Sequence, residues 1–259
     1  KFLQAAHVGY LTGIGRGLRI GGGLFLSPIG PEGMAIKDQW QWSRSNLFVG
    51  LPFYHTGLKL LYPMTDAVSA ALMVCNGWNS VVDNNAGKSV AVHITYAIAD
   101  ELTWGLVYFT GVERPDNSPE GSPLRHLLDT HVTFQATKSL ALLAHGDGGV
   151  ELNRFGTSSW IAFALALRLQ VFEGLYVAPR IDAFFETKAK NALGKAADIF
   201  WPAPYISSQT LSIDWRPEAQ VSIRVEYRHD QAGAAMFYKA DKPNAKQQDT
   251  LTMGMVVGY

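Results

Sequence analysis

The sequence is poor in cysteine and in charge. Its one cysteine, Cys75, excludes an internal disulfide framework and a zinc site built on cysteines. Charged side chains make up 17% of the chain, whereas a soluble protein has roughly 25%. Because the formal net charge is zero, there is no basic field to hold nucleic acid. We therefore expect no nucleic acid among its partners.

Long uncharged runs are also missing. A helix that spans a membrane needs about 20 apolar residues, and the most apolar segment, 158–186, contains Arg168 and Arg180. The chain starts at Lys1 with neither Met nor a signal peptide, so we expect a processed product whose targeting must be inferred from its body. No G-x-S-x-G motif of a serine hydrolase is present either.

The sequence is rich in two-residue periodicity. In 160–172 every odd position is large and apolar, and the even positions between are mostly alanine, arginine or glutamine. A strand places such alternate residues on opposite faces, whereas a helix would scatter them around its circumference. After Glu173-Gly174 the pattern restarts and continues to 186. The segment therefore predicts a long hairpin with one apolar face and one polar face.

The same alternation recurs along the whole chain. It is clear in 57–62, 89–96, 129–136, 210–216, 221–228 and 250–259. We count about thirteen strands and expect no long helix, so the chain is predicted to be all-β. The first strand, 3–12, leads into a short turn. Outer-membrane barrels have an even number of strands, so either a preceding N-terminal strand is missing or the count is off by one. We expect fourteen strands in the full chain.

Short and long connections alternate between these strands. Short turns are expected near 15–17, 63–66, 99–101, 138–139, 173–174 and 217–219, and long polar loops near 27–50, 83–88, 113–124, 146–158, 187–203 and 230–248. All short turns then lie at one end of an up-and-down meander. Outer-membrane β-barrels have this asymmetry, with short periplasmic turns and long extracellular loops.

A soluble β-sandwich would alternate as well, but its strands average about 5 to 6 residues. Strands that cross a membrane need about 9 to 11 residues, which the longer periodic segments provide. A closed sheet of this width is too wide to fill with side chains, so its apolar face must point to lipid, and in lipid it must close. We predict a single transmembrane, antiparallel β-barrel domain over residues 1–259. Aromatic residues near strand ends, Trp78 and Trp160 among them, are expected in its interfacial girdles.

Several short segments also resemble a known family. They are WSRS at 42–45, PFYHTG at 52–57, YP at 62–63, NGWN at 76–79 and DNN at 83–85. Together they resemble the signature region of the β-barrel porin type 2 family of Gram-negative outer-membrane proteins. Tyr259 is similar to the C-terminal assembly signal of such barrels. The resemblance implies a porin-like barrel that is secreted to the outer membrane, with the lipid bilayer and lipopolysaccharide around it. The family brings no functional residues with it.

The polar face supplies the candidate pore lining, in which positive residues outnumber negative ones. Such charges can orient polar or anionic solutes, or they can merely pair across neighbouring strands. Small residues on the same face, such as Ala162, Ala164 and Gly254, favour open space. The residues that we expect to line the pore are Arg19, Lys59, His93, Asp129, Arg168, Arg180, Asp182, Glu186, Asp214, Arg216, Arg224, Glu226 and Arg228.

The loop 27–50 is the candidate constriction. It carries Trp40, Trp42 and Arg44, and a loop seldom exposes two tryptophans to water. We therefore expect it to fold into the barrel and narrow it.

The sequence thus predicts a porin for passive diffusion of small polar solutes or ions. An outer-membrane lipase or protease would need a catalytic cluster that is not evident, and a closed structural or adhesion barrel would need a packed interior. We expect no enzyme activity and no cofactor or metal. The motif 145–149, HGDGG, could hold a metal but is interpreted as a solvated turn, and His126 and His131 should point to opposite faces. A homo-oligomer and a monomer both fit the sequence.

Overall fold

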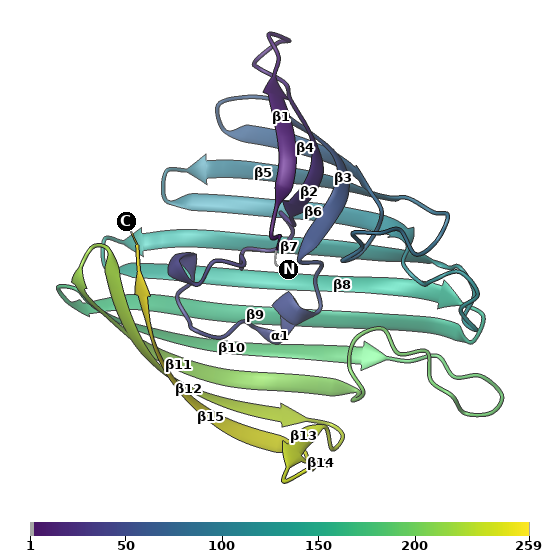
Figure 1. Ribbon diagram of the computed structural model, residues 1–259. Coiled ribbons are helices and arrows are strands. Elements are labelled where there is room, and N and C mark those ends of the chain that lie inside the picture. Colours follow the sequence, from purple (N-terminus) through teal and green to yellow (C-terminus); the bar gives the residue numbers. More distant parts are fainter. Residues whose placement is uncertain (1–2, 259) are drawn as a thin grey trace.

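The computed structural model describes residues 3–258 and consists mainly of one antiparallel sheet of thirteen strands (Figure 1). Each strand pairs with the next along the chain. The strands are Ala6–Leu11 (β1), Arg19–Leu26 (β2), Tyr54–Pro63 (β3), Val68–Cys75 (β4), Ser89–Ala99 (β5), Leu102–Val112 (β6), Leu124–Thr137 (β7), Leu140–Asn153 (β8), Gly156–Phe172 (β9), Leu175–Thr187 (β10), Tyr205–Glu218 (β11), Val221–Ala232 (β12) and Gln247–Val257 (β15).

The remaining elements lie in two connections. The β2–β3 loop contains a 3₁₀ turn, Ile36–Asp38 (η1), and a single helical turn, Asn46–Val49 (α1). The β12–β15 connection contains a small separate hairpin of Phe237–Lys239 (β13) and Lys242–Ala245 (β14). The all-β prediction and the strand count are confirmed. No helix in residues 3–258 is long and apolar enough to cross a membrane.

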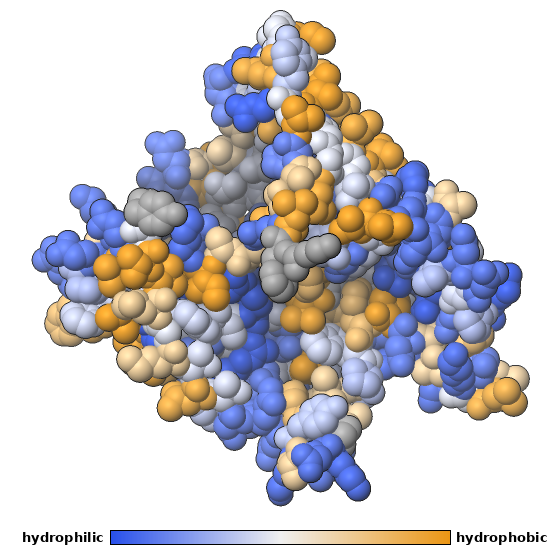
Figure 2. Space-filling model, in the orientation of Figure 1, coloured by the Kyte–Doolittle hydropathy of each residue, from blue (hydrophilic) through white to orange (hydrophobic). Residues whose placement is uncertain are grey.

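The expected orientation of the two sheet faces is confirmed. Along β9 the side chain of Ile161 is 65% exposed, whereas its neighbour Ala162 is 2% exposed. We call the face with the exposed apolar rows the outer face and the opposite one the inner face. Hydrophilic residues gather at the two ends of the strands, on the left and right of Figure 2. Such a band of apolar side chains between polar ends is what a lipid bilayer requires.

The edges of the sheet are β1 and β15, and no backbone pairing joins them in the described residues. The side chains of β1 are exposed along its length. The sheet curls so that β2, β3, β12 and β15 rise on either side of the central strands, as Figure 1 shows. Tyr259, the expected assembly signal, lies outside the described residues.

The long loop expected at 146–158 was wrong. Strand β8 continues to Asn153 and β9 starts at Gly156, so a tight turn joins them. Gly148 and Gly149 remain in the sheet, paired with Leu128 and Leu127. A Cβ on Gly149 would lie 2.1 Å from the Trp160 ring, so this glycine makes room for an indole and does not mark a turn. The loop expected at 230–248 was also partly wrong, because it contains the β13–β14 hairpin.

The placement of Trp78 and Trp160 in outer girdles was wrong as well. Trp160 is 4% exposed and packs on the inner face, with ring centroids 6.4 Å from Trp78 and 5.1 Å from Phe200. Its even number already gives it the parity of the inner-face alanines. Phe184 and Phe109 extend the same cluster. The inner face near the long loops is therefore apolar and packed, which the sequence did not predict.

Candidate functional site

All the predicted lining residues have the inner-face parity of their strands, and register brings several of them into common rows. Arg180 is opposite Thr210, which in turn is opposite Arg228. Arg19 shares its row with Leu61, two positions from Lys59. The set divides into a group that contacts the loop 27–53 and a group near the short turns. We call the segment 27–53 the inner loop, because it lies across the inner face of the central strands (Figure 1).

The inner loop is cross-linked to itself. Ser45 is the N-cap of α1, and its Oγ accepts a hydrogen bond from Phe48 N at 3.2 Å. The same hydroxyl donates to Glu32, whose carboxylate also accepts from Ser45 N. The Arg44 guanidinium folds back to donate to the carbonyls of Gly33 and Met34. These contacts join residues of the inner loop to one another. The loop also contacts the surrounding strands, which we call the wall.

Two carboxylates of the wall bind backbone N–H groups of the inner loop. Glu226 on β12 accepts from Trp42 N at 2.6 Å and from Ser43 N at 2.9 Å. Asp182 on β10 accepts from Asn46 N at 2.9 Å and from the Asn46 side-chain amide at 2.7 Å. Both carboxylates are buried. Hydrogen bonds to an ionised acceptor are the stronger kind, so these two residues anchor the loop.

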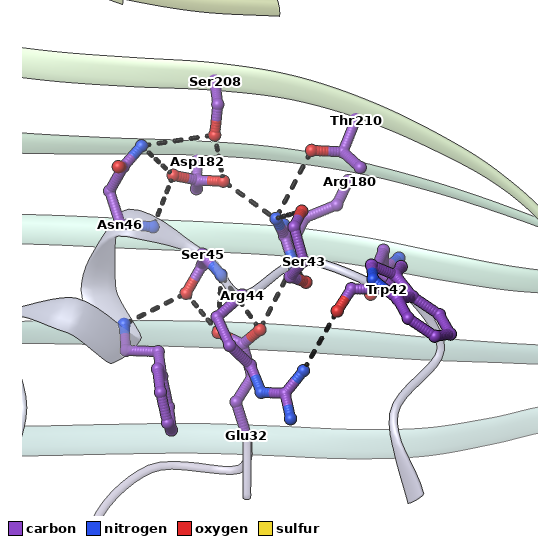
Figure 3. Close-up of polar contacts among 12 residues, drawn as sticks. Glu32, Trp42, Ser43, Arg44, Ser45, Asn46, Arg180, Asp182, Ser208 and Thr210 are labelled. Carbon is purple, nitrogen blue, oxygen red and sulfur yellow. Dashed lines mark hydrogen bonds and ion pairs between the residues drawn. The ribbon is translucent and has the colours of Figure 1, made fainter. Parts of the chain in front are cut away.

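Three arginines of the strands also bind the inner loop, and Figure 3 shows one of them, Arg180, beside Ser43, Asp182 and Thr210. Arg180 donates to the Ser43 carbonyl at 2.9 Å and pairs with Glu32 at 3.2 Å. Arg228 donates to the Arg44 carbonyl, and Arg224 donates to the carbonyls of Ile36 and Gln41. Their charges are balanced by Asp182, Asp214 and Asp230. These arginines therefore hold the loop, and little of their charge faces open space.

The two loop tryptophans lie on the inner side. Trp42 covers Gly254 on β15, where a Cβ would lie 2.1 Å from its ring. Trp40 borders a cavity of about 170 Å³ together with Glu32, Gln41 and His145. The expectation of open space over Ala162, Ala164 and Gly254 was wrong. These small residues leave room for the inner loop, because α1 packs on β9 and β10 and Trp42 fills the notch at Gly254.

The second group lies toward the short turns, and its side chains form fewer hydrogen bonds and ion pairs. Arg168 stacks on the Tyr176 ring at 3.9 Å, and the Lys59 ammonium lies 4.9 Å from the Phe25 ring. Arg216 pairs with Asp214 at 2.9 Å. His93 Nε2 is 3.3 Å from Thr95 Oγ1. Within residues 3–258, Arg19, Lys59 and Arg168 form no ion pair.

Two further predicted residues contact other parts of the chain on the inner face. Glu186 accepts from the backbone N–H groups of Ile199, Phe200 and Trp201 at 2.7 to 3.2 Å. It thereby ties the β10–β11 loop over the inner face. Asp129 is 2.6 Å from His145 Nε2.

Outside the membrane-spanning strands, Glu113 fixes one member of the aromatic cluster. Its carboxylate accepts from Trp78 N at 2.6 Å and from Ser89 Oγ at 2.5 Å. Burial is the largest influence on this group and raises the pKa of the Glu113 carboxyl. Sequence patterns did not point to Glu113, because its partners, Trp78 and Ser89, lie in other parts of the chain.

An all-β meander with an apolar outer face, polar strand ends and a charged inner face defines an outer-membrane β-barrel. A family model described as "Putative beta-barrel porin-2, OmpL-like" matches residues 1–258. The chain therefore belongs to this porin family, and it is an outer-membrane protein. No curated protein matches the sequence.

Solved porin structures share the fold at low sequence identity. The anion-selective porin from Comamonas acidovorans matches with a TM-score of 0.65 at 10% identity, over 93% of this chain and 74% of that porin. The outer membrane channel DcaP of Acinetobacter baumannii matches with a TM-score of 0.62 at 11% identity, over 93% and 73%. A trimer form of OmpT from Vibrio cholerae matches with a TM-score of 0.62 at 7% identity, over 92% and 75%.

Proposed function

We propose that this chain is a channel for passive diffusion of small polar solutes or ions, with a bore that the inner loop narrows. The observation that carries the proposal is the double anchoring of the inner loop by Glu226 and Asp182, both on the charged inner face. A loop held across the interior by buried charges gives the bore a fixed minimum width. The outer face then contacts the lipid bilayer and lipopolysaccharide, and the porin fold supports this arrangement.

We also propose a preference for anions. Near the short turns Arg19, Lys59 and Arg168 lack an acidic partner among the described residues, so their charges remain available to a solute. Rings of basic side chains favour anions in pores. The likeness to an anion-selective porin and to a trimer form of OmpT supports anion selectivity and a homo-oligomer as working hypotheses.

The test is conductance in planar bilayers with the purified full chain. We expect single-channel steps and a reversal potential, in a KCl gradient, on the anion side. Lys59→Glu and Arg168→Glu together should move the reversal potential toward cations. Lys138→Glu and Lys190→Glu together, an equal charge reversal at two exposed positions outside the sheet, are the matched control and should leave it nearly unchanged. A protein that inserts and stays electrically silent would refute the channel.

A closed structural barrel is the second candidate, and one observation favours it. The cluster of Trp78, Trp160, Phe184 and Phe200 packs on the inner face near the long loops. If this cluster seals the interior, both the wild type and an inner-loop anchor variant, Asp182→Asn, should be silent. If the inner loop alone sets the bore, Asp182→Asn should raise the conductance. Asp249→Asn, an exposed carboxylate, is its control.

A further inference from the structure

Two neighbouring strands place two carboxylates and two imidazoles in one block on the inner face. Asp129 on β7 is directly opposite Asp147 on β8, and His131 is directly opposite His145. Positions two apart on a strand share a face, so all four side chains point inward. We call Asp129, His131, His145 and Asp147 the His–Asp block. It includes the HGDGG motif that the sequence had suggested was a solvated turn, which was wrong because β8 runs through it.

The block is buried and poorly satisfied. Asp129, His145 and Asp147 are each at most 4% exposed. Like charges directly opposite on a sheet are destabilising, and a buried carboxylate needs a compensating charge or hydrogen bonds. His145 Nε2 is 2.6 Å from Asp129, and the Trp160 indole donates to Asp147 at 2.8 Å. These contacts use one oxygen of each carboxylate.

Four polar atoms of the block remain buried without a hydrogen-bond partner. They are Asp129 Oδ1, Asp147 Oδ2, His131 Nδ1 and His145 Nδ1. His131 Nδ1 and Asp129 Oδ1 are 3.6 Å apart, which is too long for a hydrogen bond. Buried unpartnered groups of this kind call for an explanation such as a bound ion. Here they occur on four adjacent side chains that all belong to metal-ligating residue types.

Three of the ligand atoms are close enough to share one ion, and neighbouring glycines make room for the imidazole rings. One ligand atom from each of Asp129, His145 and Asp147 lies within 4.8 Å of the other two. Gly105 on β6 lies beside His131, where a Cβ would be 2.4 Å from the ring. Gly30 of the inner loop, at φ +76°, passes over His145, where a Cβ would be 3.2 Å from the ring. A cavity of about 170 Å³ lies on the interior side of the block, where His145 borders it.

We propose that the His–Asp block binds one divalent transition-metal ion, with Zn²⁺ as the reference case. Its donors are His145, Asp129 and Asp147, with His131 as the fourth. Imidazole nitrogens with carboxylate oxygens suit Zn²⁺ and its neighbours, whereas Ca²⁺ and Mg²⁺ take oxygen ligands. The ion neutralises two facing carboxylates and links β7 to β8 beneath the inner loop. This proposal does not depend on the chain being a channel.

The test uses the purified full chain, folded in detergent and stripped with a chelator. We expect equilibrium dialysis to give one Zn²⁺ per chain, and Zn²⁺ to raise the unfolding temperature. Co²⁺ as a probe should give the visible absorption bands of a nitrogen and oxygen site. His145→Gln and Asp147→Asn should each weaken Zn²⁺ binding by at least about tenfold, since each removes a ligand.

His126→Gln is the matched control, because His126 lies on β7 but contacts the outward Tyr108. Its affinity for Zn²⁺ should equal that of the wild type. Two results would overturn the site: no stoichiometric binding of Zn²⁺ or Co²⁺, or binding that both block variants retain in full. Should neither variant fold, the Co²⁺ spectrum of the unmodified chain decides, and absence of the bands rejects the site.

Discussion

Arginine has different partners in two regions of the inner face, the centre and the part near the short turns. Near the centre, Arg180 is 2% exposed and is bound by Glu32, Asp182 and the Ser43 carbonyl. Near the short turns, Arg168 is half-buried, stacks on the face of Tyr176 and forms no ion pair within residues 3–258. Both arginines point inward from adjacent strands. An inward charge is available to a solute only where the protein's own backbone and carboxylates leave it unpaired.

The largest loss of stability should follow a change at the centre of the inner face. Arg180→Met should lower the free energy of unfolding by about 3 to 5 kcal/mol, because removing one partner of a buried charge pair leaves the other uncompensated. Urea unfolding in lipid vesicles measures this. A loss no greater than that of Arg168→Met would show that the two regions are energetically alike.

The next effect tests how closely the inner loop contacts the wall. Gly254→Leu should cost about 1 to 3 kcal/mol, because it overpacks the notch filled by Trp42. It should also shift tryptophan fluorescence to the red as the ring is displaced. Gly258→Ala, whose added Cβ meets nothing nearer than 3.9 Å, should change neither quantity. Equal behaviour of the two variants would contradict the packing of Trp42 on β15.

Ser45→Ala tests the loop's internal order. Loss of the α1 N-cap should cost about 1 kcal/mol, and the lost contact with Glu32 should increase the mobility of the inner loop. Ser139→Ala, in the exposed β7–β8 turn, is the control. Urea unfolding gives the stability, and noise in the open-channel current reports the loop. A quiet channel with unchanged stability would mean that the wall anchors alone fix the loop.

The smallest effect on stability is expected near the short turns. Arg168→Met should cost no more than about 1 kcal/mol, the usual size of a partly exposed cation–π contact. Its effect should instead appear as a reduced preference for anions in reversal-potential measurements. A large loss of stability without a change in selectivity would reverse the roles assigned to the two regions.

Much of the fold could be predicted from the sequence because alternation is a local property. The segment 158–186 identified its own outer and inner residues, since lipid accepts the odd positions of β9 and rejects Arg168. Parity also placed Trp160 inward, although its aromatic character suggested a girdle. The tight β8–β9 turn could not be predicted, because Gly148-Gly149 has the composition of a loop and its reason, the Trp160 ring, lies on the next strand.

The sequence by itself determined most of the strands, the alternation of side chains along them and the resemblance to the family, because these depend on residues close together in the chain. Tertiary structure decided which inward charges are free. Glu226 meets Trp42, and Asp182 meets Asn46, across more than a hundred residues of chain. The His–Asp block likewise forms only when the β7–β8 register sets Asp129 against Asp147. Periodicity predicts which face a side chain lies on, and only the tertiary structure shows which residues it contacts there.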